Sequence, residues 1–226
     1  MKQPEIPERF CWTKFGSEAG EGIDKILARK DRERVTNGGV FLWGIGNSVA
    51  PGIRALVRHE DEPAAIFSPM RAKAKTIDSA PARVVVWRGA RGVDGREWDI
   101  PRGSTVTSRG DSSGGMRKRS HYALVCRSDA PLRHSSARSA QLRFGSICNL
   151  LSGSPLGYSQ VTSVVGYREC NSDAGPLYAI GFRARLVYPY FVELFDPIVT
   201  DTSSLVSLNF NGTEPAVTGP RQLALE

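Results

Sequence analysis

The chain has 226 residues, of which 40% are hydrophobic, and its formal net charge is +7. This length predicts one folded domain over residues 1–200. Residues 201–226 form a polar extension punctuated by Pro and Gly, which we expect to be poorly ordered. No stretch holds the roughly 20 apolar residues of a membrane span, and the N-terminus MKQPEIPERF lacks the apolar core of a secretory signal. We therefore expect a cytoplasmic protein with no membrane partner.

The positive charge is concentrated in the first part of the chain. Residues 1–143 contain 26 basic and 16 acidic residues, whereas residues 144–226 contain four basic and seven acidic ones. The resulting net charge of +10 over residues 1–143 favours a polyanionic partner. Arginine supplies 23 of the 30 basic residues and suits forked contacts with phosphates and bases. We expect the partner to be nucleic acid, either DNA or RNA.

The first 70 residues alternate between predicted strands and helices. Residues 10–15, FCWTKF, predict a strand through their aromatic residues and alternation. Residues 17–34 predict a helix, and residues 40–43, VFLW, predict a second strand. A second helix begins near Pro51, which suits a first helical turn. Residues 64–68, AAIFS, predict a third strand.

The first predicted helix is apolar on one side only. Ala19, Ile23, Ile26 and Leu27 form its apolar stripe, so we expect its many charged residues to face solvent. Ser48 precedes the second helix at a position where a serine hydroxyl often caps a helix, and we predict that role for it.

From residue 82 onward the pattern is rich in strands. The stretches RVVVWR, STVTSR, HYALVCR, SQVTSVVGY and YAIGFRARLVY are all rich in β-branched and aromatic residues. Residues 135–152 predict one more short helix, packed through Leu142, Ile147, Leu150 and Leu151. The expected fold class is α+β: a β-rich, partly closed barrel of mainly antiparallel strands with two or three packed helices.

A glycine-rich stretch, VFLWGIGNSVAPGIRAL at residues 40–56, has the strand, turn and helix order of a phosphate-binding loop. Gly44 and Gly46 fit such a loop, but the third glycine position holds Val49 and no Gly-Lys-Ser/Thr occurs. We interpret the stretch as a sharp strand exit, which leaves Asn47 and Ser48 at the rim of a pocket.

Metal and cofactor chemistry has no sequence support. The cysteines form no C-x-x-C pair and the three histidines have no ligand spacing, so we expect structural thiols, no metal and no cofactor. The four cysteines are Cys11, Cys126, Cys148 and Cys170.

Tryptophans interleaved with basic residues suggest binding of unstacked bases, since every base has a π face. Trp12 and Trp43 are equally suited to base stacking and to a core, whereas Trp87 and Trp98 favour a core. The basic residues expected to contact phosphates or bases are Lys14, Arg71, Lys73, Lys75, Arg88, Arg91, Arg109, Arg117, Lys118 and Arg119.

The N-terminal third shows one family resemblance. FCWTKFGSEAGEGIDKILARKDRERVTNGGVFLWGIGN runs through a strand with Trp, a break, a helix, a glycine turn and an aromatic strand. This order resembles the opening of EVE-type domains in the PUA-like superfamily, which includes the YTH readers. The resemblance covers about 45 of the 226 residues. It implies a small β-barrel with packed helices and an aromatic pocket for a modified base, at Trp12 and Trp43.

The leading hypothesis is a nucleic-acid-binding protein, a reader of modified bases through an aromatic pocket. One alternative is an enzyme acting on nucleic acid or nucleotides, by base modification or as a nuclease. Convergence of Lys14, a glutamate and His121 in one cleft would favour that enzyme. Its acid–base candidates are Lys14, Glu18, Glu21, Asp111 and His121. The second alternative is a structural or assembly module of a phage or mobile element, with the tryptophans at an oligomer interface.

Overall fold

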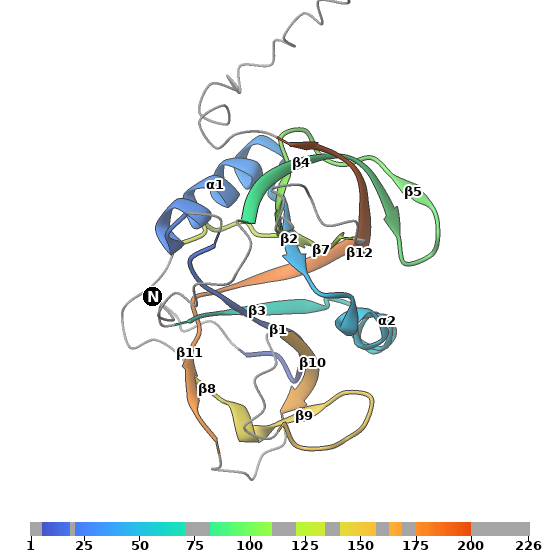
Figure 1. Cartoon of the computed structure of the whole chain (residues 1–226). Helices are drawn as coiled ribbons and strands as arrows, with labels where there is room; N and C mark the ends of the chain where they lie inside the picture. Colours follow the sequence, from blue (N-terminus) through green and yellow to red (C-terminus); the bar gives the residue numbers. More distant parts are fainter. Residues whose placement is uncertain are drawn as a thin grey trace, which may run out of the picture.

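The structure is a computed structural model that describes residues 6–18, 21–70, 82–109, 121–133, 141–156, 163–168 and 175–199 (Figure 1). The first part holds β1 (Arg9–Phe15), α1 (Ile23–Thr36), β2 (Val40–Ile45), α2 (Ala50–His59) and β3 (Ala64–Pro69). The second part holds β4 (Ala82–Gly92), β5 (Glu97–Trp98), β6 (Thr105–Arg109), β7 (His121–Arg127), β8 (Gln141–Arg143), β9 (Ile147–Asn149), β10 (Ser163–Arg168), β11 (Leu177–Ala179) and β12 (Phe182–Val199). The extension over residues 201–226 lies outside the described residues.

The alternating order predicted for the first 70 residues is confirmed. The predicted cap is wrong, because Val49 is the N-cap of α2 and no side chain caps that helix. The chain leaves β2 through a short 3-10 turn, Asn47–Val49, so Ser48 falls one residue too early and is exposed. Neither α1 nor α2 is long and apolar enough to cross a membrane.

The helix predicted over residues 135–152 is wrong where the structure describes it, from residue 141. Residues 141–149 form β8, a 3-10 turn and β9. Strand pairing explains the difference, because β8 pairs with β11 and β9 pairs with β10. β8 and β9 each bury one side chain in the same core. Leu142 and Ile147 are buried in that core, whereas Leu151 is exposed.

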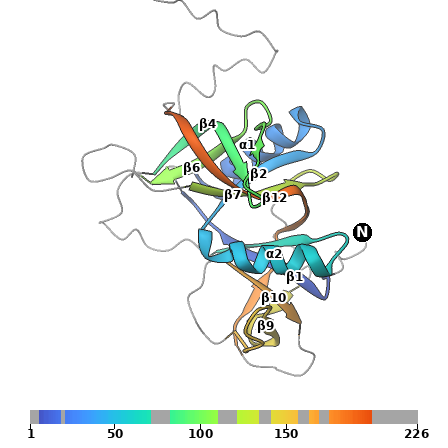
Figure 2. The ribbon, with the colours of Figure 1, turned by 90° about the vertical axis from the view of Figure 1, so that its right-hand side faces the viewer.

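Most strands belong to one mixed sheet, in which β1 and β3 are parallel and the other pairs are antiparallel. The order is β2-β7-β12-β3-β1-β10-β9, and β4 pairs with β12 and also with β5 and β6. Figures 1 and 2 show three tiers: α1 and β4 to β7 at the top, β1, β3 and α2 in the middle, and β8 to β11 at the bottom.

The top tier contains an arc of five strands in the order β6–β4–β12–β7–β2, which we call the arc. Its concave side buries one core that includes Leu42, Val85, Trp87, Val106 and Leu194. Among the described residues no hydrogen-bonded ladder joins β2 to β6, so the arc does not close into a barrel. The two strands nevertheless touch, since a Cβ at Gly44 would lie 2.8 Å from Val106 Cγ1.

The side chains of α1 bridge this seam between β2 and β6. Lys30 Nζ donates to the carbonyl oxygen of Thr105, and the backbone N–H of Thr105 donates to Glu33 Oε1 at 2.9 Å. The Thr105 hydroxyl also donates to Glu33 and accepts from Arg29 Nη1 at 2.6 Å. In the part of the chain that the structure describes, β6 has only β4 as a strand partner. The α1 side chains therefore satisfy backbone groups that a neighbouring strand would otherwise bind.

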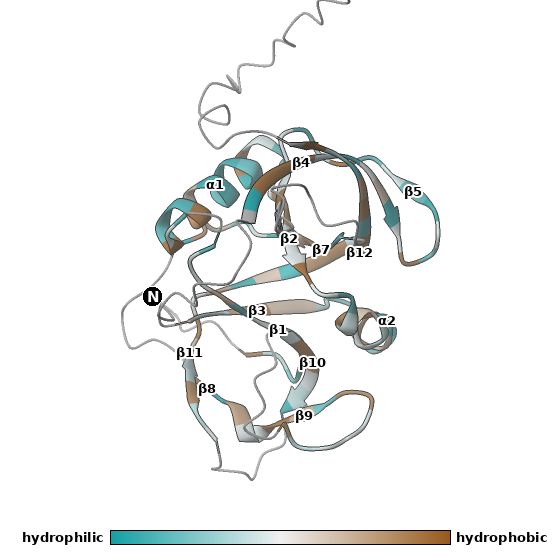
Figure 3. Cartoon of the chain, in the orientation of Figure 1, coloured by the Kyte–Doolittle hydropathy of each residue, from teal (hydrophilic) through white to brown (hydrophobic). Residues whose placement is uncertain are grey.

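The expectation that the charged face of α1 lies in solvent is wrong at the seam. Figure 3 shows α1 as mostly hydrophilic, yet Arg29, Lys30 and Glu33 are buried, with Glu33 only 1% exposed. Glu21 balances the charge by pairing with Arg29, Oε2 to Nη2, at 2.7 Å. Buried charges persist only when they are paired and hydrogen-bonded, and here two cations meet two carboxylates.

Replacing Glu33 by Gln tests the seam. The variant leaves the Lys30 ammonium buried without its counter-charge, so we expect a loss of about 3–5 kcal/mol in the free energy of unfolding. Arg32→Gln on the exposed side of the same helix is the matched control and should change that free energy by about 0.5 kcal/mol or less. Equal stabilities of the two variants in urea unfolding would contradict the claim that buried charges of α1 bridge the seam.

The Lys30 ammonium gives a pH-dependent test. Burial lowers the pKa of Lys30 from 10.5 to about 8, although the Glu33 carboxylate acts in the opposite direction. Because the unfolded chain keeps the higher pKa, it binds more protons between these values. The contribution of Lys30 to the free energy of unfolding should therefore rise as the pH increases from about 8 to about 10.5. An NMR titration of the Lys30 Cε should show a midpoint well below 10.5, and a midpoint at or above it would contradict this burial.

Candidate nucleic-acid interface

The two tryptophans predicted to form a base pocket lie inside cores. Trp12 is 0% exposed, and its indole N–H donates to Ser68 Oγ at 2.9 Å. Trp43 is 7% exposed, and its ring lies edge-on to Phe15 and Phe67. Neither ring presents an open face on which a base could stack, so both positions match the core interpretation of these residues.

The acid–base candidates do not share one cleft among the described residues. Lys14 Nζ lies 3.5 Å from the Tyr178 hydroxyl. It also makes cation–π contacts, 5.3 Å from the centroid of the Trp12 ring and 5.1 Å from that of Tyr178. Glu21 pairs with Arg29, and the exposed Glu18 bridges the backbone of Glu21. His121, by contrast, contacts residues of the arc core. The convergence that would favour an enzyme is therefore not found.

One end of the arc brings several predicted residues together. Neighbouring strands of the arc run antiparallel, so the C-terminal ends of β2 and β6 share one end with the N-terminal ends of β4 and β7. We call this end the arc mouth. Asn47 and Ser48 follow β2 there and are exposed. In Figure 2 the tip of β6 and the start of α2 both lie on the left.

His121 is the central side chain of the arc mouth. Its Nε2 lies 2.6 Å from the Ser108 hydroxyl oxygen, and its ring lies 4.7 Å from the ring of Trp87. Ser108 and Trp87 are buried, whereas His121 is half-buried. Arg83, the cross-strand partner of Ser108, is exposed beside this group. The mouth thus combines an imidazole ring, a guanidinium group and hydroxyl groups.

Both strongly basic segments of the chain attach at the arc mouth. The segment 71–81 enters β4 at Ala82, and the segment 110–120 leaves β6 at Arg109. Ala82 and Arg109 are direct cross-strand partners, and His121 is the first residue after the second segment. Each segment has three basic residues and one acidic residue in its sequence. The residues Arg71, Lys73, Lys75, Asp111, Arg117, Lys118 and Arg119, and the side chain of Arg109, lie outside the described residues.

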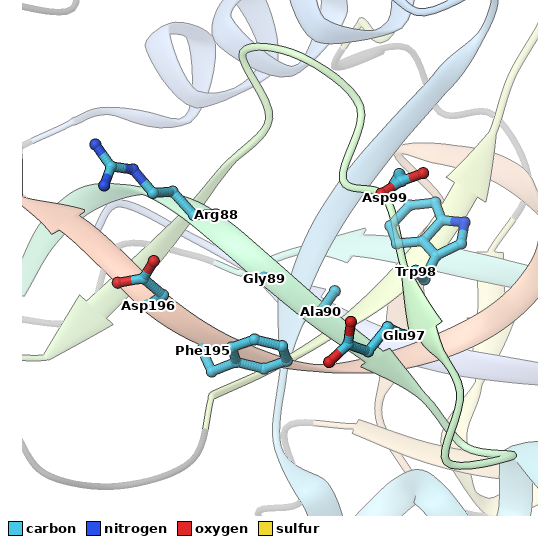
Figure 4. A pocket seen from close by; sticks show the side chains of 8 residues that line it. All are labelled: Arg88, Gly89, Ala90, Glu97, Trp98, Asp99, Phe195 and Asp196. Carbon is cyan, nitrogen blue, oxygen red and sulfur yellow. The ribbon is translucent and has the colours of Figure 1, made fainter.

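A second surface lies on the outer side of β4, β5 and β12. Figure 4 shows a shallow depression there, with Phe195 beside Gly89. A Cβ at Gly89 would lie 2.0 Å from the Phe195 ring, so only glycine lets that ring rest on β4. Arg88 lines the depression, and Arg91 lies 5.7 Å from the Phe195 ring. The carboxylates that line the depression are Glu97, Asp99 and Asp196, so its lining contains both positive and negative side chains.

No metal centre is evident in the part of the chain that the structure describes, because no three His, Cys, Asp or Glu side chains gather there. Comparison of the chain with protein-family models, curated proteins and solved structures gives no match.

Sequence reasoning missed Arg83, Ser108, Tyr188 and Phe195. Ser108 and His121 are 13 positions apart, and only the strand register brings them into contact. Tyr188 ends the stretch YAIGFRARLVY, which predicts a strand without showing which rings face outward, and Phe195 lies beyond that stretch. The sequence carries no local signal for either arrangement.

Thiol labelling tests the interpretation of the cysteines. Cys11, Cys126 and Cys148 are buried thiols, and burial raises the pKa of Cys11 to about 12 and that of Cys126 well above its usual value. We expect all three to resist a thiol reagent at pH 8 in the folded chain and to react in denaturant, because the thiolate is the reactive form. Peptide mapping by mass spectrometry locates the label. Rapid labelling of Cys11 or Cys126 in the folded chain would contradict this core.

Proposed function

We propose that this chain binds nucleic acid through the arc mouth, as a binding or accessory protein without an enzymatic step. The observation that carries the proposal is the pairing of Ala82 with Arg109, which attaches both basic segments at one end of the arc. Arg83 adds an exposed cation at the same end, within the part of the chain whose net charge is +10. Phosphate contacts from clustered Lys and Arg supply most of the affinity of such proteins.

The PUA-like, partly closed barrel and the EVE resemblance belong to this proposal. The contact of Gly44 with Val106 and the α1 bridge to Thr105 support a barrel whose seam is sealed by side chains instead of a ladder. Reading of a modified base, which the resemblance implies, would then fall to the arc mouth. There the half-buried His121, packed on the buried Trp87, supplies the aromatic ring that Trp12 and Trp43 cannot offer from the core.

Binding titrations against salt test the proposal. We expect the chain to bind labelled DNA or RNA at about 50 mM salt, with log affinity falling linearly as log salt rises. Replacing Arg117, Lys118 and Arg119 together by Gln removes three cations and should reduce the salt slope by about two to three. Fluorescence anisotropy measures both quantities.

Arg168→Gln is the control, because Arg168 is exposed on β10, outside the arc. It should leave the affinity and the salt slope nearly unchanged. Absence of binding at about 50 mM salt, or binding without a salt slope, would overturn the proposal.

A further inference from the structure

A bulge interrupts the pairing of β12 with β7. The register of β12 against β7 shifts between Leu186 and Phe191, so residues 187–190 lie outside the ladder. Bulges of this kind re-aim side chains and are frequent beside binding sites. Within this bulge Tyr190 has φ 65°, a left-handed conformation that bulky residues rarely adopt and that concentrates at functional sites.

The bulge presents the ring of Tyr188 in a fixed position. Tyr188 is 56% exposed and is the most exposed aromatic side chain among the described residues. Its hydroxyl donates to Asp94 Oδ2 at 2.8 Å, and its ring lies edge-on to Tyr190 with centroids 6.2 Å apart. The hydrogen bond lowers the pKa of Asp94 and raises the pKa of Tyr188, since it favours the carboxylate and the neutral phenol. An exposed ring that is already held in place loses little entropy when a ligand stacks on it.

Exposed arginines occur along β4 between the arc mouth and this bulge. Arg83 is exposed at the mouth, on the side of Ser108, whereas Arg88 and Arg91 are exposed farther along, on the outer side that carries Phe195. Arg96 follows in the next turn with 82% of its side chain exposed. Arg96 Nε lies 3.9 Å from Asp94 Oδ2, beside the Tyr188 hydroxyl. Since a strand rises about 3.3 Å per residue, β4 spans roughly 33 Å from the mouth to the bulge. Phe195, 37% exposed, is a second outward ring beside this path.

Carboxylates are interspersed with these arginines. Glu97 and Glu193 are the cross-strand partners of Arg91, and Asp196 lies in the depression beside Arg88. A duplex presents one phosphate per about 1.7 Å of its axis and hides its base faces, so a surface of mixed charge suits it poorly. A single strand has fewer phosphates per length and open base faces, and it binds by stacking on aromatic rings as well as by charge.

We infer that Tyr188 is a stacking platform for an unpaired base, and that the nucleic acid bound by this chain is single-stranded. The strand runs from the basic arc mouth along β4 to the β12 bulge, where Arg96 meets its phosphate. This inference rests on the proposed function and adds to it the class of nucleic acid and a second contact point.

Binding of a 12-nucleotide single strand and of a 12-base-pair duplex to the full chain tests the inference. Tyr188→Ala should weaken binding of the single strand about 5- to 100-fold, the range of one lost base–aromatic stack, without changing the salt slope. Tyr188→Phe keeps the ring but loses the hydrogen bond to Asp94, so it should weaken binding much less than Tyr188→Ala does. Leu151→Ala is the matched control, because Leu151 is a comparably exposed apolar side chain beside β9. Anisotropy at two salt concentrations measures all four chains.

The outcomes separate this inference from the proposed function. If the unmodified chain binds neither nucleic acid, the proposed function fails, and the inference with it. If the chain binds but Tyr188→Ala binds the single strand as tightly as the unmodified chain, only the inference fails. The inference would also be overturned if Tyr188→Ala weakened binding of the single strand and of the duplex equally. Tighter binding of the duplex than of the single strand by the unmodified chain would overturn it as well.

Discussion

The contact between Glu33 and Thr105 is the constraint on which the top tier depends. β2 and β6 approach each other without forming a ladder, so the edge of β6 would expose its backbone groups to a partly buried seam. Glu33 and Lys30 bind the N–H and C=O of Thr105 from α1. Because β6 pairs only with β4 among the described strands, this bridge also fixes the position of the β4–β6 pair. The bridge therefore holds the start of β6, the strand whose other end lies at the arc mouth.

β12 connects that tier to the remainder of the protein. Its 18 residues pair with β3, then with β7 and β4, so one strand belongs to the middle and the top tiers. The change of partner requires a bend, and the bulge at residues 187–190 supplies it. The same bend turns Tyr188 outward, toward Asp94 of the turn between β4 and β5. The proposed stacking ring is thus a consequence of how the sheet is built.

Local patterns predicted the elements well and the contacts between them poorly. Alternation and turn residues were sufficient for β1 to β4, since strand propensity and glycine positions act over a few residues. The sequence pattern predicts Arg29 and Glu33 in solvent, because nothing near them in the sequence indicates that Thr105 lies opposite. The partners of His121 were likewise hidden, since strand register sets them. Trp12 and Trp43 were ambiguous because a large ring suits a core and a base equally.

Hydrogen–deuterium exchange with and without a bound single strand tests the central claim most directly. The account predicts slower exchange on binding at the start of β4, the end of β6, the start of β7 and the bulge at residues 187–190. Exchange in β8, β9 and β11, in the bottom tier, should stay unchanged and serves as the internal reference. Protection confined to that tier, with the arc mouth unaffected, would contradict the account.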